Sequence, residues 1–284
     1  MGRDGVMGCR RGSSFLEGWG NGVLLTDMSN GVPLTDILGS PYEFLLAYPQ
    51  PDSAELRRRL SELRALGVDQ IYQVGEKQLG GFAILGMGYC GVVMVARWRG
   101  RLAALKVRRT NATQPSLTRE ANLLAIANEV QIGPRCLAHS PNFLVMDYLG
   151  GDPFLPWVVR VVDRGDRMLL QSVLIQLLED GFRLDQLGLD HGNLRCITQH
   201  AIVQDNRAQI LDFSTASRDR RPANVTALTQ GLLISTAIAN QVQQLFTVDK
   251  LGLIERLRNY KQRRDRDRFE QLVAFLFDQV FVGP

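Results

Sequence analysis

The stretch that decides the fold is ILGMGYCGVVMVARWRGRLAALKV, residues 84–107. Its first half contains Gly86, Gly88 and Gly91, which form the pattern G-x-G-x-x-G. Val93 extends this pattern to G-x-G-x-x-G-x-V. A three-glycine pattern alone is weak evidence, because a chain with 27 glycines can produce one by chance. The residues after the third glycine therefore decide what the pattern means.

The chain after the third glycine has the composition of a β-strand. A dinucleotide-binding fingerprint requires a helix at this point, so that its N-terminal amides face a pyrophosphate. Residues 92–96 are instead VVMVA, a β-branched run that favours a strand. Gly100 then provides a turn, and residues 102–107 favour a second strand. The sequence thus predicts a strand–loop–strand hairpin with the glycines at its tip and Lys106 at its end.

Protein kinases place a glycine-rich loop over the phosphates of ATP and a lysine on the following strand. In this chain the basic residues are almost all arginine, and the only lysines are Lys77, Lys106, Lys250 and Lys261. A lysine at the end of the second strand is therefore a stronger signal than one more surface charge. A compact ammonium is what a pair of phosphates and one carboxylate can share.

Length and composition bound the class of protein. A chain of 284 residues indicates one large domain or two modest lobes, and a hydrophobic content of 45% is enough for a packed core. No apolar run reaches the ~18 residues needed to span a bilayer, and no secretory signal is evident. The four cysteines form no C-x-x-C pair, so neither a zinc site nor a disulfide framework is indicated. We therefore expect a cytoplasmic protein that does not enter a membrane.

The first part of the chain differs in composition from the rest. Residues 1–52 are rich in Gly, Ser, Asn and Pro and show no sustained periodicity, which predicts a poorly structured N-terminal extension with short ordered pieces near residues 42–48. A helix is expected to follow, with Ser53 as its N-cap, leucines along one face and Gly67 as its end.

A second helix is expected after Pro115, with Leu117, Glu120 and Leu124 on one face. A carboxylate within an apolar stripe is costly unless it is paired. One interpretation places Glu120 at the edge of the stripe, where it reaches water. The other pairs it with Lys106, as a helix glutamate does in protein kinases, and the hairpin upstream favours this second interpretation.

Two later segments place polar residues at the ends of expected strands. Residues 142–151, NFLVMDYLGG, predict a buried strand that runs into a glycine-rich connector. A helix over residues 167–187 is followed by the loop LDHGNL and by two short strands, residues 201–204 and 209–213. Asp212 is thus expected at a strand end, where its carboxylate can point into a cleft.

The last part of the chain, residues 224–284, is expected to be wholly helical. A basic run extends within it from Arg256 to Arg268. Such a run is usually a solvated helix face, and contact with RNA or a ribosome through it is the alternative interpretation.

From about residue 53 onward the motifs resemble those of small atypical protein kinases of the RIO type, in particular the RIO-like serine/threonine kinases of archaea and bacteria. The resemblance rests on LGMGYCGVVMVA, AALKVRR, TREANLLAIAN, LDQLGLDHGNL and LDFSTAS, in this order. It implies a bilobal α+β kinase-like fold, with a β-rich N-lobe (residues 53–146) and a small helical C-lobe (residues 147–284) with a shortened activation segment. It also implies ATP and Mg²⁺ or Mn²⁺ as cofactors, and an unknown protein substrate or partner.

The resemblance assigns roles to individual residues of this chain. Lys106 would hold the α- and β-phosphates, Glu120 would pair with it, and Asp212 would bind the metal. The remaining nucleotide contacts would come from the glycine loop, the hairpin and the connector: Gly86, Gly88, Gly91, Val93, Ala104, Met146, Asp147, Tyr148 and Leu149.

Two positions depart from the pattern of the family. Where the family carries a catalytic aspartate, or a glutamate in close relatives, this chain has Asn193. An amide cannot act as a general base, although it can orient a hydroxyl. The usual metal-binding asparagine downstream is replaced by Thr198 or, with a longer loop, by His200, and neither is a usual ligand of a hard cation.

The sequence therefore predicts an ATP-dependent serine/threonine kinase, or an autophosphorylating ATPase, with slow turnover. A pseudokinase, which binds the nucleotide and docks a partner without phosphate transfer, is the first alternative. A phosphotransferase for small molecules on the same fold is the second, although little chain remains to build its substrate pocket.

Overall fold

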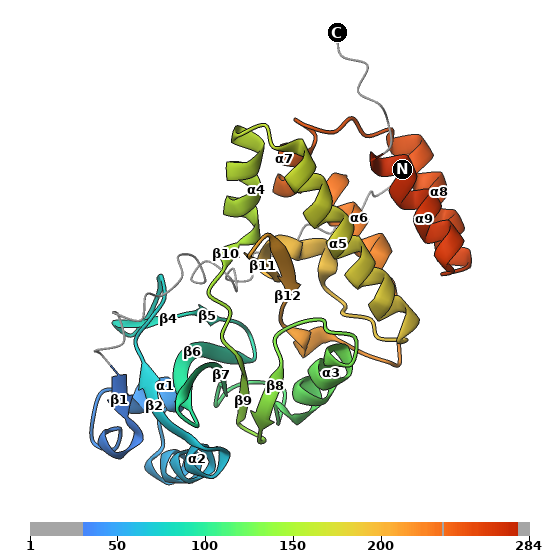
Figure 1. Ribbon diagram of the computed structural model, residues 1–284. Helices are drawn as coiled ribbons and strands as arrows, with labels where there is room; N and C mark the ends of the chain where they lie inside the picture. Colours follow the sequence, from blue (N-terminus) through green and yellow to red (C-terminus); the bar gives the residue numbers. More distant parts are fainter. Residues whose placement is uncertain (1–30, 235, 278–284) are drawn as a thin grey trace, which may run out of the picture. The chain divides into compact units, whose positions relative to one another are not determined.

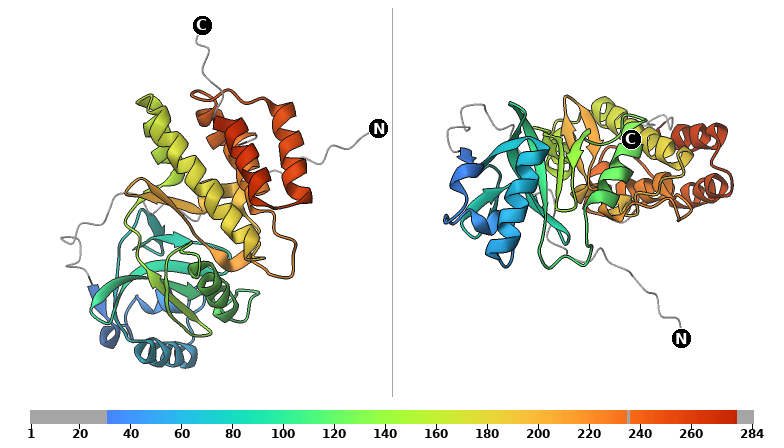
Figure 2. Two further views of the ribbon diagram at one scale, coloured as in Figure 1. Left: turned by 45° about the vertical axis from the view of Figure 1, so that its right-hand side comes forward. Right: turned by 90° about the horizontal axis from the view of Figure 1, so that it is seen from below.

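The computed structural model describes residues 31–234 and 236–277, which make an α+β protein with a mostly antiparallel sheet and several helices (Figure 1). The chain divides into two compact units. The first contains the chain up to Leu117 together with Leu137–Tyr148, and the second contains Thr118–Cys136 and the chain from Leu149 onward. Figure 2 shows that strands dominate the first unit and helices the second.

The first unit is built on a sheet with seven strands within the described residues. In spatial order they are β1 (Gly31–Pro33), β2 (Val68–Tyr72), β6 (Gly91–Trp98), β7 (Arg101–Arg108), β9 (Phe143–Asp147) and β8 (Cys136–His139), with β5 (Gly86–Met87) paired to β6. A separate hairpin joins β3 (Lys77–Leu79) and β4 (Phe82–Ile84). The predicted hairpin is confirmed as β6 and β7, but the glycines are not at its tip. They lie at the other end of β6, in the turn between β5 and β6, and the tip is formed by Arg99 and Gly100. Arg99 and Gly100 both have positive φ, as the commonest two-residue hairpin turn requires.

The helix predicted from residue 53 is confirmed as α2 (Ser53–Leu66). Its N-cap is Asp52, whose carboxylate accepts hydrogen bonds from the two backbone N–H groups that follow Ser53, so the assignment of Ser53 as the cap is wrong by one residue. Gly67 ends the helix in the left-handed conformation, with φ of 88°. The leucines on the inner face of α2 belong to the same hydrophobic core as alternate residues of β6 and β7.

Residues 31–52 are not a loose extension, and here the expectation from composition is wrong. They form β1, a 3-10 helix η2 (Leu34–Asp36) and a short helix α1 (Glu43–Leu46). Leu34, Leu45 and Leu46 are at most 2% exposed and belong to the core of the first unit. The short ordered piece expected near residues 42–48 corresponds to α1. The elements β1 and η2 were not expected, because three residues are too few to show periodicity. The rest of the predicted extension lies outside the described residues.

The second unit is largely helical. Its helices are α3 (Thr118–Asn128), α4 (Phe154–Asp163), α5 (Arg167–Gln186), α6 (Asn224–Leu233), α7 (Ala237–Val242), α8 (Lys250–Gln262) and α9 (Arg266–Phe277). Two 3-10 helices, η3 (Leu194–Gln199) and η4 (Phe213–Thr215), flank a small sheet of β10 (Asp152–Pro153), β11 (Ala201–Gln204) and β12 (Arg207–Ile210). The predicted strand pair is confirmed, but its second strand begins and ends earlier than expected, before Asp212.

Helix α3 belongs to the second unit, whereas the predicted N-lobe of residues 53–146 included it. The segment after the helix explains this difference. A Cβ on Gly133 would lie 3.0 Å from both Leu124 of α3 and Phe213 of η4, which shows how closely these elements pack. Arg183 of α5 also donates a hydrogen bond to the carbonyl of Val130, at 3.0 Å. The apolar stripe of a helix predicts that it is buried but not against which neighbour.

A buried polar network holds the second unit together around Asp185 of α5. Its carboxylate accepts hydrogen bonds from the backbone and side-chain nitrogens of Asn224 and from the hydroxyl of Tyr260. Asn224 in turn donates to the carbonyl of Leu189 and accepts from the backbone N–H of His191. Burial raises the pKa of Asp185, and these hydrogen bonds oppose that shift. Helices α5, α6 and α8 thereby fix the start of the loop at residues 189–193.

The length and apolar character of the helices bear on the expectation that the chain does not enter a membrane. In the parts of the chain that the structure describes, no helix combines the length and apolar character needed to cross a bilayer.

Candidate functional site

The glycine-rich sequence forms a tight turn between β5 and β6. Gly86 pairs with Val93 in the antiparallel ladder, and the backbone N–H of Gly88 donates to the carbonyl of Gly91 at 2.9 Å. Tyr89 stands at the tip with 72% of its surface exposed. The loop predicted from the three glycines is therefore a closed turn whose backbone is presented at one end of the sheet.

The predicted nucleotide contacts of the hairpin share one face of the first unit's sheet. Successive side chains of a strand point to opposite faces. Residues 92, 94 and 96 of β6 and 103, 105 and 107 of β7 belong to the core with α2, so Val93, Ala104 and Lys106 lie on the opposite face. In the ladder Lys106 is opposite Val93 on one side and Leu144 on the other, and Ala104 is opposite Met146. The ladder neighbours of Lys106 and Ala104 on this face are therefore apolar.

Lys106 itself is buried, with 2% of its surface exposed. An ammonium in such a position is costly unless charged or polar groups surround it. The adjacent Gly91 has no Cβ, and the methylene groups of the lysine lie in the space that a Cβ would occupy. The contact between Gly91 and Lys106 thus brings the glycine-rich turn and the lysine ammonium together within the first unit.

Three predicted residues follow β9 at the boundary between the units. Asp147 ends the strand, Tyr148 is the last residue of the first unit, and Leu149 is the first of the second. All three are half-buried. The glycine-rich connector predicted after the strand is thus the point at which the chain passes from one unit to the other.

Glu120 lies in the first turn of α3 and is only 4% exposed. The interpretation that it sits at the edge of the stripe and reaches water is therefore wrong. Because Glu120 belongs to the second unit and Lys106 to the first, their pairing stays a prediction.

The second unit brings together three of the predicted polar residues. The side-chain amide of Asn193, before η3, is hydrogen-bonded to Nε2 of His200 at 2.6 Å. On the other side of the ring, Nδ1 of His200 lies 3.9 Å from Oδ2 of Asp212. Thr198 lies within η3, and the structure records no hydrogen bond or ion pair from it to these three among the described residues. The cluster is therefore Asn193, His200 and Asp212.

Asp212 adopts an unusual backbone conformation. Its φ of 64° places it in the left-handed region, which is costly for a residue with a side chain. Its carboxylate accepts one long hydrogen bond, 3.4 Å, from the backbone N–H of Ser214, and 13% of the side chain is exposed. The strained backbone turns Asp212 away from the direction of β12 and next to His200.

His191 has a structural position beside this cluster. It is completely buried, and its Nε2–H donates to the carbonyl of Leu211 at 3.0 Å. Its ring contacts Phe213 edge-on, with centroids 5.0 Å apart. Burial lowers the pKa of His191 from 6.5 to about 4, so the ring is neutral at ordinary pH. It joins the loop that carries Asn193 to the segment that carries Asp212.

Asp190, in the same loop as Asn193, has both carboxylate oxygens hydrogen-bonded. One accepts a hydrogen bond from Nε of Arg220 at 2.9 Å, and the other accepts from the backbone N–H of Ala223 at 3.1 Å. Its backbone also pairs with that of Ser217. Asp190 is thus a capping residue of the loop. No sequence pattern pointed to Arg220 or Asn224, which hold this loop from more than 25 residues downstream.

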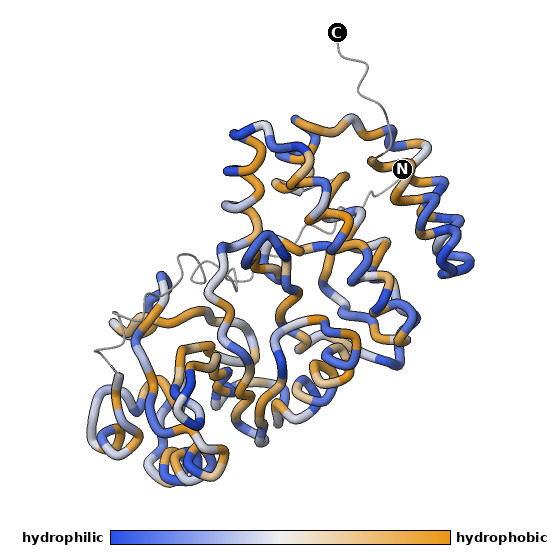
Figure 3. Tube along the Cα trace, viewed as in Figure 1, coloured by the Kyte–Doolittle hydropathy of each residue, from blue (hydrophilic) through white to orange (hydrophobic). Residues whose placement is uncertain are grey.

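The basic run of residues 256–268 is partly engaged in contacts within the second unit. Arg266 forms ion pairs with Glu179 and Glu270, and the guanidinium of Arg256 lies 3.8 Å from the centre of the Phe275 ring. Figure 3 shows the connection between α8 and α9 as hydrophilic. These contacts fit a solvated helix face, and RNA contact stays a prediction.

Metal ligation by several side chains is not evident. Within the described residues no group of three or more His, Cys, Asp or Glu side chains is placed to hold a metal ion. A carboxylate that acts together with phosphates of a nucleotide is a different arrangement and needs no such group.

Comparisons with known proteins do not assign the chain to a family. No protein family model matches the sequence, and no curated protein matches it.

Proposed function

We propose that this chain binds ATP with a divalent cation and transfers its γ-phosphate to a hydroxyl of a protein or of the chain itself. The observation that carries the proposal is the face of the first unit's sheet on which Val93, Ala104, Lys106 and Met146 lie together beside the glycine-rich turn. An apolar surface suits a flat base, while an ammonium and the amides of a glycine turn suit phosphates.

In this proposal the second unit supplies the metal ligand and the residue that faces the acceptor. Mg²⁺ prefers oxygen ligands and is usually held by one or two carboxylates together with substrate phosphates. Asp212 offers a partly exposed carboxylate of this kind, whereas the imidazole of His200 suits softer metals. A bound cation would neutralise charge on the transferring phosphate.

Asn193 then orients the acceptor without removing its proton. Its amide is tied to His200, so its direction is fixed by a neighbour that is itself 5% exposed. A general base is worth roughly 10²–10⁴ in rate, and positioning together with charge neutralisation provides most of the rest. We therefore propose a slow transferase.

The experiment is a calorimetric titration of ATP with Mg²⁺ into the wild type, Lys106→Ala and the control Lys250→Ala, which alters an exposed lysine. We expect the wild type and the control to bind ATP equally, and Lys106→Ala to bind at least about tenfold more weakly, since a charge-assisted hydrogen bond is lost. Absence of binding by the wild type, or equal binding by Lys106→Ala, contradicts the proposal.

The second candidate function is a pseudokinase, and the hydrogen bond between Asn193 and His200 favours it. Asn193 stands where a kinase has the carboxylate that accepts the proton of the substrate hydroxyl, and the hydrogen bond to His200 already uses part of the amide's hydrogen-bonding capacity. This candidate predicts ATP binding without transfer or release of phosphate. A turnover that disappears in Lys106→Ala would exclude it.

Contact with RNA through residues 256–268 is compatible with either function. If it occurs, the affinity falls steeply as salt rises, because counterions are released from the phosphates. Weak binding that does not change with salt contradicts an RNA interface.

A further inference from the structure

The glycine-rich turn is held from outside the hairpin by one arginine. Arg109 follows β7, and its Nη1 donates a hydrogen bond to the carbonyl of Gly88 at 3.3 Å. Its backbone N–H donates to the carbonyl of Cys90 at 3.0 Å. Two carbonyls of the same turn therefore point toward Arg109.

These two hydrogen bonds also determine the direction of the amides in the turn. In a planar trans peptide the C=O and the following N–H point in opposite directions. Because the carbonyls of Gly88 and Cys90 face Arg109, the N–H groups of Tyr89 and Gly91 point away from it. Backbone N–H groups that point the same way in a turn form a concavity that attracts anions. The arginine thus orients the groups that a phosphate would contact, without needing to contact the phosphate itself.

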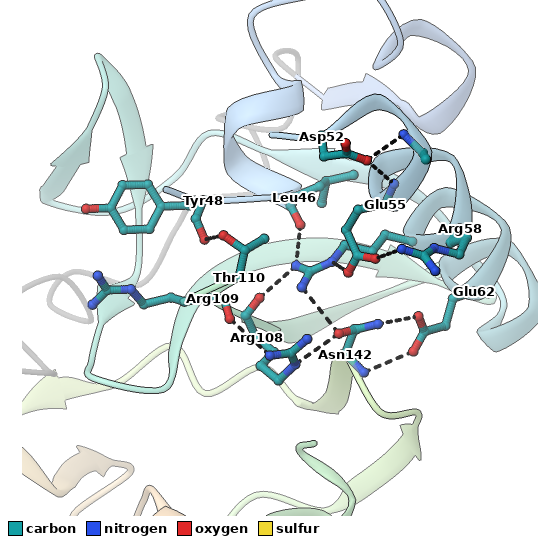
Figure 4. A network of polar contacts seen from close by, with 12 residues as sticks. Leu46, Tyr48, Asp52, Glu55, Arg58, Glu62, Arg108, Arg109, Thr110 and Asn142 are labelled. Carbon is teal, nitrogen blue, oxygen red and sulfur yellow. Dashed lines mark hydrogen bonds and ion pairs between the residues drawn. The ribbon is translucent and has the colours of Figure 1, made fainter. Parts of the chain in front are cut away.

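Arg109 is in turn positioned by the segment that precedes α2. Its guanidinium lies over the ring of Tyr48, with the central carbon 5.0 Å from the ring centroid. The next residue, Thr110, donates from its backbone N–H to the carbonyl of Tyr48 at 2.8 Å and from its hydroxyl to the same carbonyl at 3.2 Å. Figure 4 shows Arg109 extending alongside the Tyr48 ring.

The segment that carries Tyr48 is itself fixed to β7 by a buried guanidinium. Arg59 of α2 is 0% exposed, and its Nη1 donates both to the carbonyl of Leu46 at 2.6 Å and to the carbonyl of Arg108 at 2.7 Å (Figure 4). Its Nη2 donates to the side chain of Asn142 at 3.2 Å. One side chain thus joins the residues just before Tyr48 to the residue just before Arg109.

We propose that Arg109 is a positioning residue for the glycine-rich turn, and that the segment of residues 42–48 controls the turn through Tyr48. The expectation that Arg109 affects nucleotide affinity rests on the proposed function. The expectation that Tyr48 and Arg109 order the turn does not. The contact of Tyr48 with Arg109 orders the turn, and loss of that contact loosens the turn.

The test measures amide hydrogen exchange over residues 84–91 in the full chain without nucleotide, and ATP affinity in parallel. The variants are Arg109→Ala, Arg109→Lys, Tyr48→Ala and Tyr48→Phe. The last is the matched control, because it keeps the ring on which the guanidinium lies. Exchange in β9 of the same unit reports whether each variant is folded.

We expect exchange over residues 84–91 to rise by about tenfold in Arg109→Ala and Tyr48→Ala, since a hydrogen bond from a charged donor is lost, and to stay unchanged in Tyr48→Phe. Exchange in Arg109→Lys is expected to lie between that of the wild type and that of Arg109→Ala, because lysine keeps the charge but lacks the planar guanidinium. Equal exchange in Arg109→Ala, Arg109→Lys and the wild type overturns the proposal. If exchange rises as expected but the wild type binds no ATP, the proposed function fails and the positioning role stands.

Discussion

Gly91 and Lys106 pack so closely that a Cβ on the glycine would press on the lysine stem, and it would collide with the carbonyl oxygen of Val107. A Cβ on Gly91 would lie 3.2 Å from Cγ and 3.4 Å from Cε of Lys106, and 2.8 Å from the carbonyl oxygen of Val107. The third glycine of the motif is thus needed for contact with the lysine, in addition to any approach of a ligand. The spacing between the third glycine and the lysine, which first indicated a phosphate site, also allows Gly91 of β6 to pack against Lys106 of β7.

This contact predicts the effect of Gly91→Ala. The new methyl group must push the lysine stem aside or separate the strands, so ATP affinity should fall by about tenfold, which corresponds to roughly 1.4 kcal/mol. Gly165→Ala is the control. It introduces a side chain at a positive φ of 67° in the second unit, where nothing lies within 4 Å, and should lower stability without changing ATP affinity. Equal affinities of Gly91→Ala and wild type in a nucleotide titration would contradict the prediction that the packing beside Gly91 sets the position of Lys106 for ATP binding.

The buried imidazole of His191 predicts how stability depends on pH. Its pKa is about 4 in the folded chain against an ordinary value of 6.5, so between these values the unfolded chain binds the additional proton. Stability is therefore full above the ordinary pKa and is lost as pH falls toward the folded value, by up to ~1.4 kcal/mol per pH unit.

The comparison is urea unfolding at about pH 7 and about pH 5 for wild type, His191→Gln and the control His139→Gln, which alters an exposed histidine. The loss on acidification should be smaller in His191→Gln and unchanged in the control. Asp180 and Asp185, whose pKa values burial raises, act in the opposite sense but equally in all three proteins. A loss as large in His191→Gln as in wild type would mean that His191 is protonated within the fold.

Substitution of Asn193 separates a slow transferase from a pseudokinase. Asn193→Asp restores a carboxylate at the acceptor position, and phosphate transfer should rise, by at least ~10² if the carboxylate serves as a base. Asn193→Ala removes the orienting amide and the hydrogen bond to His200, and transfer should fall below that of the wild type. Steady-state assays with equal protein concentrations give the comparison. Absence of turnover in all three proteins would favour a pseudokinase.

The network around Asp185 predicts a specific loss of stability. In Tyr260→Phe the hydroxyl that donates to the buried carboxylate at 2.8 Å is removed, and a hydrogen bond to a charged group contributes about 1.5–3 kcal/mol. The free energy of unfolding, measured in urea, should fall by roughly that amount. Tyr89→Phe, at a tyrosine that is 72% exposed, should leave it unchanged. If Tyr260→Phe were as stable as wild type, the hydroxyl would not be part of the network.

Local patterns predicted the hairpin of β6 and β7, helix α2 and the strand pair before Asp212, because each depends on residues that are near one another in the chain. Val93 and Ala104 were named as nucleotide contacts only through the resemblance, and the place of these two residues and Lys106 on one face follows from the strand pairing of the structure. The sequence did not reveal that residues 31–52 are packed, because Leu34, Leu45 and Leu46 are buried by elements too short to show a period.

Sequence patterns could not predict contacts between side chains and groups that are distant in the chain. The hydrogen bond between Asn193 and His200 spans seven residues and the bond from Arg59 to Arg108 spans 49, and in each case a side chain meets a group that periodicity cannot place. Helix α3 was assigned to the wrong unit for the same reason. Its apolar face predicted burial, but its partners around Phe213 come from almost a hundred residues away.

The most direct test of the account measures the fate of a radiolabelled γ-phosphate of ATP, with Mg²⁺ or Mn²⁺, for wild type and Asp212→Asn at equal concentration. The account predicts slow transfer or release of the label by the wild type and a loss of at least about a hundredfold in Asp212→Asn, because charge neutralisation at the phosphate is removed. Equal label transfer by the two proteins would contradict the account.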